Sequence, residues 1–315
     1  AFRWHSGKRV VIIGYQSGQI DIFNDGAVIN VSDIYRAEII GSKQIKNIKV
    51  SGDPAFIVTP FGVSVMNMNS YAILSTYRFG TSDSSVVVND LAVLSDSLYV
   101  ATDNGIFTAP RQGLNLLDFG NWESLTSIPN SEENWNFCEG WADSLWIGRT
   151  VESGQMDQLY KYKNGNSVQV SLIDQGGKLR RLHKEDEYLN ITTSTRLMWY
   201  KPNGEFVYRA GYFGTRYMGA HDMVAYNEWV YFVADPVNGI NRKVKFQSAD
   251  EFITPNGPAY AKSFHVNVTD DEVWVSGGSH GQPFNNYGIY RKTFLKSQKV
   301  SRIAANLASP FSKGQ

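Results

Sequence analysis

The clearest pattern along the chain is an apolar strand, a tight turn that contains glycine, and a second strand in which apolar and polar residues alternate. A glycine at such a turn supplies the positive φ that a short hairpin needs. The first three copies place their strands and turns at 10–15, Gly18 and 19–23, at 55–59, Gly62 and 63–66, and at 97–102, Gly105 and 106–108. Looser copies begin with apolar strands at 144–148, 188–192, 229–233 and 273–277. The pattern therefore predicts seven β-hairpin units.

The spacing of the turns identifies the kind of repeat. The turn positions are Gly18, Gly62, Gly105, Gly154, Thr195, Gly239 and Gly288, which gives a mean repeat of 45 residues from 270 residues over six intervals. Four strands of about 5–6 residues with short connections fill such a length. This is the size of one propeller blade. We therefore expect an all-β fold, a β-propeller of seven blades with four antiparallel strands each, forming a single domain over 1–315.

Large side chains recur at one place in the apolar strands, where neighbouring blades are expected to pack against each other. They are Phe56, Tyr99, Trp146, Tyr231 and Trp274. Cys138 is expected to be a small buried hydrophobe rather than a nucleophile. The ends of the chain suggest an inner strand at 1–4 and an outer strand at 296–303, and 33–44 has room for one short helical turn. Whether the two ends meet is left open by the sequence.

Composition and charge exclude several functions. The 315 residues contain 30 Lys and Arg against 30 Asp and Glu, which argues against a nucleic-acid partner or a polybasic membrane surface. The single cysteine excludes an internal disulfide and a cysteine-based zinc cluster. No apolar run approaches the ~20 residues of a transmembrane helix. Because the chain begins with Ala1, we expect it to be part of a longer, multidomain protein.

Motifs that carry chemistry are mostly missing. There is no G-x-S-x-G elbow, phosphate-binding loop, H-E-x-x-H pair or calcium loop. The five histidines fall in different units and none is paired at ligand spacing, so the sequence predicts neither a metal nor a cofactor. The acidic runs at 184–187 and 270–272 precede apolar strands and are expected to be solvated turns. A carboxylate pair assembled from separate blades remains an alternative.

Loops and strand ends supply the candidate binding residues. The segment 277–288 is long and polar for a hairpin, and long loops on rigid scaffolds often bind ligands. Arginines, Arg181 among them, recur near strand ends in consecutive units, and a guanidinium suits phosphate, carboxylate or a sugar acid. Solvated charges and a harmless insertion are the alternative interpretations. The candidate ligand- or partner-binding residues are Arg149, Arg180, Arg196, Arg216, His221 and His280.

Residues 10–125 show a more specific resemblance. It is carried by the segments 20–23, 31–36, 40–43, 88–93, 101–107 and 115–122. The amino-acid sequence of these segments resembles that of the N-terminal β-propeller of the PorZ family of the bacterial type IX secretion system. The resemblance implies a non-enzymatic, extracytoplasmic component at the outer-membrane surface or in the periplasm of a Gram-negative bacterium. Its expected partners are secretion subunits or anionic lipopolysaccharide. The resemblance also implies that a second propeller and a β-sandwich follow, and it transfers no catalytic residue.

Two other classes of function remain as alternatives. Residues 143–148 resemble the repeat of extracytoplasmic sensor propellers in hybrid two-component regulators, which bind oligosaccharides. A propeller glycosidase or lyase is the third class.

Overall fold

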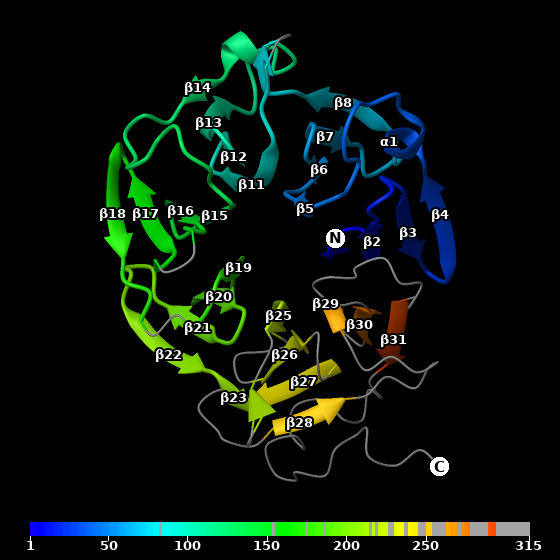
Figure 1. The fold of residues 1–315 in the computed structure, drawn as a ribbon. Coiled ribbons are helices and arrows are strands. Elements are labelled where there is room, and N and C mark those ends of the chain that lie inside the picture. Colours follow the sequence, from blue (N-terminus) through cyan, green and yellow to red (C-terminus); the bar gives the residue numbers. More distant parts are fainter. Residues whose placement is uncertain are drawn as a thin grey trace.

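The computed structural model describes residues 1–81, 84–152, 155–173, 176–185, 187–213, 216–217, 220–225, 230–235, 239–244, 250–253, 263–269, 272–277 and 289–293. Within these residues, six four-stranded antiparallel sheets and one three-stranded sheet are arranged around a common centre (Figure 1). Two further hairpins have two strands each. The all-β propeller predicted from the sequence is confirmed, with six four-stranded blades.

The strands of each sheet follow one another in the chain, and the first strand of each sheet lies nearest the centre (Figure 1). The first three sheets consist of β1 (Phe2–His5), β2 (Val10–Gly14), β3 (Ile20–Asn24) and β4 (Ala27–Val31), then β5 (Asn47–Val50), β6 (Ala55–Thr59), β7 (Gly62–Met66) and β8 (Ile73–Tyr77), then β11 (Val88–Leu94), β12 (Ser97–Thr102), β13 (Gly105–Pro110) and β14 (Glu123–Ser124). The fourth and fifth consist of β15 (Phe137–Trp141), β16 (Ser144–Arg149), β17 (Gln158–Lys163) and β18 (Asn166–Val170), then β19 (Leu179–Lys184), β20 (Leu189–Thr193), β21 (Leu197–Tyr200) and β22 (Phe206–Ala210). The last two consist of β25 (Asp222–Ala225), β26 (Val230–Asp235), β27 (Gly239–Val244) and β28 (Asp250–Ile253), then β29 (Ser263–Val268), β30 (Glu272–Gly277) and β31 (Ile289–Thr293).

The connections between sheets contain the remaining elements. They are the hairpin β9 (Gly80–Thr81) and β10 (Ser84–Ser85), the hairpin β23 (Tyr212–Phe213) and β24 (Arg216–Tyr217), the helix α1 (Asp33–Arg36) and the short 3-10 helix η1 (Phe119–Asn121). The helical turn expected within 33–44 and the inner strand expected at 1–4 are thus present as α1 and β1. In the part of the chain that the structure describes, no helix is long and apolar enough to cross a membrane.

The core lies between neighbouring sheets. The second strand of a sheet is covered on both faces, so β2 and β6 are buried along their whole length, whereas β3 alternates between buried and partly exposed residues. Four of the five aromatic positions predicted for this core are buried, namely Phe56, Trp146, Tyr231 and Trp274, and Tyr99 packs against it half-buried. Burial of such faces is the main force that holds one sheet to the next.

The tight turns share one hydrogen bond. The Thr59 hydroxyl donates to the Gly62 carbonyl at 2.9 Å, and the Thr102 hydroxyl donates to the Gly105 carbonyl at 2.8 Å. In the fifth sheet the matching pair is Thr193 with Arg196, at 3.5 Å. The sequence placed Thr195 at the glycine position of this unit, but the hydrogen bond shows that Arg196 occupies it. The expected turns at Gly154 and Gly288 lie outside the described residues.

The first and last sheets contact each other. The Trp274 ring on β30 lies 6.3 Å from that of Phe2 and 5.2 Å from that of Phe23, measured between centroids. Val11 and Ile13 of β2 belong to the same apolar cluster. Sheet seven, with three described strands, is therefore packed on sheet one. The fourth strand expected at 296–303 lies outside the residues that the structure describes.

Candidate functional site at the ring axis

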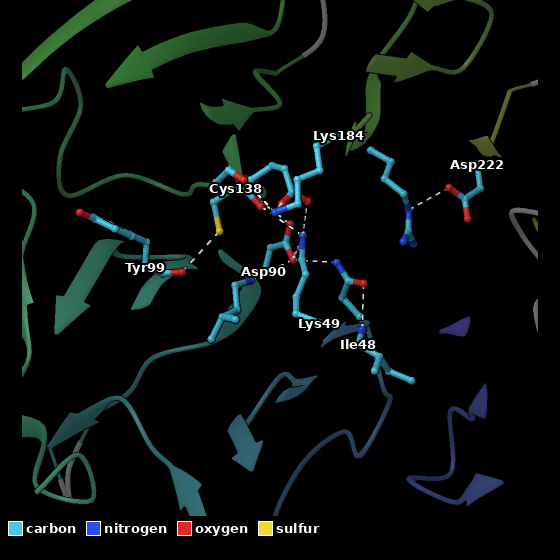
Figure 2. Close-up of polar contacts among 12 residues, drawn as sticks. Ile48, Lys49, Asp90, Tyr99, Cys138, Lys184 and Asp222 are labelled. Carbon is cyan, nitrogen blue, oxygen red and sulfur yellow. Dashed lines mark hydrogen bonds and ion pairs between the residues drawn. The ribbon is translucent and has the colours of Figure 1, made fainter. Parts of the chain in front are cut away.

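The innermost strands bring charged side chains together near the axis of the ring. Lys49 on β5 extends toward β15, where its ammonium lies 2.8 Å from Glu139 Oε2 and 3.9 Å from Asp90 Oδ1 on β11 (Figure 2). Lys184 on β19 reaches the other oxygen of Glu139 at 3.3 Å. The side chains of Lys49 and Glu139 are only 8% and 5% exposed. Three sheets are thus connected through buried charges, and the more exposed Lys184 adds a contact from a fourth.

The pairing decides the protonation of these groups. Burial alone would raise the pKa of Glu139, but the charges of Lys49 and Lys184 outweigh it and lower the pKa to about 2. Burial would likewise lower the pKa of Lys49, and the charges of Asp90 and Glu139 raise it instead. Both groups are therefore ionised at neutral pH, as a buried pair must be.

A second cluster, centred on Asp222 of β25, joins sheets five, six and seven. Asp222 Oδ1 lies 3.4 Å from Arg181 Nε on β19, and Asp222 Oδ2 lies 3.5 Å from His265 Nδ1 on β29. The His221 ring packs edge-on against that of His265, with centroids 5.5 Å apart. Burial opposes ionisation of Asp222, but Arg181 and His265 hold its pKa below the usual range.

The histidines of this region are held neutral. Burial lowers the pKa of His183 and of His265 to about 4, and it lowers that of His221 well below the usual range. Three of the five histidines thus converge here, although the sequence assigned them to different units. Among the residues that the structure describes, no group of three or more His, Cys, Asp or Glu has an arrangement that could hold a metal ion.

A repeated irregularity positions residues at the start of the inner strands. The register shifts between Val88 and Asp90 in β11, between Leu179 and Arg181 in β19, and between Ser263 and His265 in β29. The extra residue of each bulge is re-aimed relative to a regular strand. In β19 this residue is Arg180, whose pKa is lowered by burial against the opposing charge of Asp157.

The candidate residues gather at one end of the ring, which we call the hairpin end. It carries the turns that join the second and third strands, and each inner strand also starts there because neighbouring strands are antiparallel. Arg149 ends β16, Arg180 lies near the start of β19, Arg196 is in the β20–β21 turn, and His221 directly precedes β25. The topology thus places these four residues at the same end.

The arginines at the hairpin end differ in their surroundings. Arg149 is buried, pairs with Glu133, and has its guanidinium carbon 5.9 Å from the centroid of the Trp135 ring, so it is engaged in packing. Arg196 is half-buried, donates from Nη1 to the Thr195 carbonyl at 3.1 Å, and fills the space beside Gly211. A Cβ on Gly211 would lie 2.6 Å from Arg196 Nη1. Arg180 and Arg196 are both partly exposed, unlike the buried Arg149.

Other sequence predictions had different outcomes. The side chain of Arg216 and the whole of His280, with its loop, lie outside what the structure describes. Cys138 is buried as expected, and burial raises its pKa well above the usual range. Lys184, which was assigned to a solvated turn, is the last residue of β19, and its side chain is 46% exposed while also contacting Glu139. The sequence analysis did not find the axial groups Lys49, Asp90 and Glu139, because all that they share in the sequence is a charged residue within an inner strand.

Comparison with known proteins relates this geometry to a family. Residues 1–123 match the family described as the N-terminal beta-propeller domain of PorZ of the type IX secretion system. No curated protein sequence matches the chain. PorZ of Porphyromonas gingivalis, described as an essential bacterial surface component of that system, is 18% identical, with a TM-score of 0.65 over 88% of this chain and 35% of that chain.

Two other solved structures share the fold at low identity. The extracellular domain of a putative hybrid two-component system of B. thetaiotaomicron has a TM-score of 0.63 and 13% identity, over 92% of this chain and 37% of that chain. Virginiamycin B lyase from Staphylococcus aureus has a TM-score of 0.70 and 14% identity, over 93% and 94% of the two chains. The chain thus spans about a third of the PorZ and sensor structures.

The resemblance seen in residues 10–125 agrees with the matched range. Over residues 1–123, the chain carries the sequence pattern of the PorZ N-terminal β-propeller family.

Proposed function

We propose that the protein is a non-enzymatic propeller module of a type IX secretion system, located outside the cytoplasm at the bacterial outer membrane. It acts there as a scaffold that docks a partner subunit or anionic lipopolysaccharide during attachment of secreted proteins. The observation that carries this proposal is the match of residues 1–123 to the PorZ propeller family. The 35% of PorZ that the chain spans supports the further proposal that it is one propeller of a longer protein.

The architecture suggests how the ring is completed. We infer seven blades, the seventh containing β29, β30 and β31. The packing of Trp274 on Phe2 and Phe23 supports this, since it already joins sheet seven to sheet one. A closed ring gives a rigid platform, because every sheet then buries both faces.

The docking surface is the hairpin end. Arg180 lies at a bulge and Arg196 at a tight turn of this end, and the nearby carboxylate Asp222 is already paired with Arg181. A guanidinium offers two parallel donors to a phosphate or carboxylate. The hairpin end therefore suits an anionic partner.

Charge reversal tests this surface. Biolayer interferometry compares binding of the protein and of the Arg180→Glu/Arg196→Glu variant to immobilised lipopolysaccharide from the host outer membrane and to purified secretion subunits. We expect about tenfold weaker binding of the variant, because two charge-assisted contacts are reversed. The control Arg9→Glu changes an exposed arginine in the β1–β2 turn at the opposite end. Equal affinities of the variant and the control protein, with unchanged thermal unfolding, would remove this docking surface.

A sensor propeller is the second candidate. The likeness to the B. thetaiotaomicron extracellular domain over 92% of this chain favours it. Sequencing the gene beyond codon 315 separates the two: a transmembrane helix followed by a kinase domain supports the sensor, and a second propeller supports the secretion module. Screening against glycans with reducing-sugar detection tests the third class, since turnover would contradict a non-enzymatic role.

A further inference from the structure

The outer rim of the ring contains a hollow of about 410 Å³ between sheets four and five. It is lined by the outer strands β17 and β18 and by the turn that joins β21 to β22. Figure 1 shows β18 and β22 following one another along the rim, far from the inner strands β15 and β19. The hollow is thus separate from the axial clusters, and its volume is within the range of small-molecule sites.

The alternation of β17 explains why the hollow forms. Leu159, Lys161 and Lys163 share one face of this strand, and their partners on β18 are Val170, Val168 and Asn166. The Leu159 and Val170 pair is buried in the core between sheets four and five. The two following pairs extend beyond that core, where Lys163 and Asn166 are exposed. The hollow is the open continuation of the seam between the sheets.

Sheet five closes the other side. Gly204, with φ of +91°, brings its turn close to β18, so that a Cβ there would lie 3.5 Å from Val170 Cγ2. Asn203 lines the hollow from the same turn. Phe206 follows, and its ring packs on that of Tyr200 with centroids 5.7 Å apart. This side therefore supplies an amide group and an aromatic ring fixed by packing.

The charged residues that line the hollow are both lysines. Lys161 and Lys163 line it, and in the part of the chain that the structure describes neither ammonium pairs with a carboxylate. No Asp or Glu is among the lining residues. The nearby Glu205 is bound by Lys201, whose ammonium lies 3.1 Å from each of its carboxylate oxygens. The charged side chains among the described residues that line the hollow are therefore both cationic.

The chemistry of the lining selects a class of ligand. We propose that this rim hollow binds a saccharide that carries a carboxylate or a phosphate group. The amides of Asn166 and Asn203 suit hydroxyl groups, and the lysines suit the anion. Val168, which is 64% exposed, and Phe206 offer an apolar surface to the C–H face of a sugar ring. This assignment stands on the lining alone and does not depend on docking at the hairpin end.

Calorimetric titration tests the assignment with defined probes. Trigalacturonate supplies carboxylates, glucose 1-phosphate supplies a phosphate, and maltotriose is the neutral control. We expect one or both anionic sugars to bind and maltotriose to bind at least about tenfold more weakly. Lys163→Glu should weaken the anionic sugar by about tenfold or more, and Asn166→Ala should weaken it by a smaller factor. Both residues are exposed, so the variants are expected to fold.

The matched control is Lys8→Glu, which reverses an exposed lysine outside the hollow. It should bind as the unaltered protein does, and Arg180→Glu/Arg196→Glu is titrated beside it. Equal binding of all three sugars, no binding of either anionic sugar at millimolar concentration, or the same affinity in Lys163→Glu and Lys8→Glu would overturn the proposal. Loss of binding only in the arginine variant would assign the saccharide to the hairpin end and also overturn it.

Discussion

At the scale of single residues, the axis of the ring contains charged side chains that are buried and paired with opposite charges. Lys49 and Glu139 form a pair in which both side chains are less than a tenth exposed, with exposed fractions of 8% and 5%. Removing one member of such a pair leaves an uncompensated buried charge, which is far more costly than the loss of an exposed pair. Individual axial residues should therefore contribute strongly to stability.

Lys49→Met tests that contribution. We expect the free energy of unfolding to fall by about 3–5 kcal/mol, because Glu139 and Asp90 then lose their buried cation. The control Lys201→Met breaks an exposed pair with Glu205 and should cost far less, because exposed pairs contribute little to stability. Urea unfolding measures both values. Similar losses in the two variants would contradict the description of the axis as a buried network.

The neutral histidines predict a pH dependence. Because the pKa values of His183 and His265 are lowered to about 4, the unfolded chain takes up protons between pH about 6.5 and about 4 that the folded protein does not. Stability should be complete above about pH 6.5 and should fall as the pH is lowered through this window, by at most about 1.4 kcal/mol per histidine per pH unit. Urea unfolding of the protein and of His183→Gln/His265→Gln checks this. The variant should show a flatter profile, and identical slopes would refute the prediction.

At the scale of elements, the hairpin is the unit that the sequence specifies best. Thr59 with Gly62 and Thr102 with Gly105 make the same hydrogen bond, so two copies of the pattern have the same local structure. The inner strands are harder to predict, since β5 has four residues and β25 also has four. The charged residues of these inner strands interrupt the apolar pattern. Which partners they have depends on strands more than 40 residues away in the chain, as Lys49 and Glu139 illustrate.

The bulges explain why the candidate arginines could be found only in part. Arg180 was expected near a strand end, and it lies near the start of β19 at a register shift. No local pattern distinguishes it from Arg149, which the structure uses for packing against Trp135. The role of Arg149 depends on its contacts with Glu133 and Trp135, which lie in the segment before the first strand of its own sheet.

Gly105→Ala tests the geometry of the turn. Gly105 has φ of +92°, and a Cβ there would lie 2.2 Å from the Ser131 carbonyl oxygen. We expect a loss of about 2–4 kcal/mol from backbone strain and the steric clash combined. Gly26→Ala is the matched control, since Gly26 has φ of +83° and no atom within 4 Å of its Cβ position. It should cost about 1–2 kcal/mol. Equal losses on urea unfolding would show that the contact is unimportant.

At the scale of the whole molecule, the repeat predicts a ring, and the structure shows that its first and last sheets are in contact. This contact depends on residues at both ends of the described chain, so no single repeat specifies it. The ring places the hairpin end, the axial charge clusters and the rim hollow on one framework. The family match in residues 1–123 and the two arginines at the hairpin end lead to the central proposal of a docking module in surface attachment.

The most direct test is the fraction of secreted proteins that remains attached to the cell surface in a strain from which the gene has been deleted. We predict that the deletion releases these proteins into the medium and reduces their modification with surface sugar. The unaltered gene and one encoding Arg9→Glu should restore attachment, whereas one encoding Arg180→Glu/Arg196→Glu should restore it only weakly at equal protein abundance. Normal attachment and normal sugar modification in the deletion strain would contradict the account.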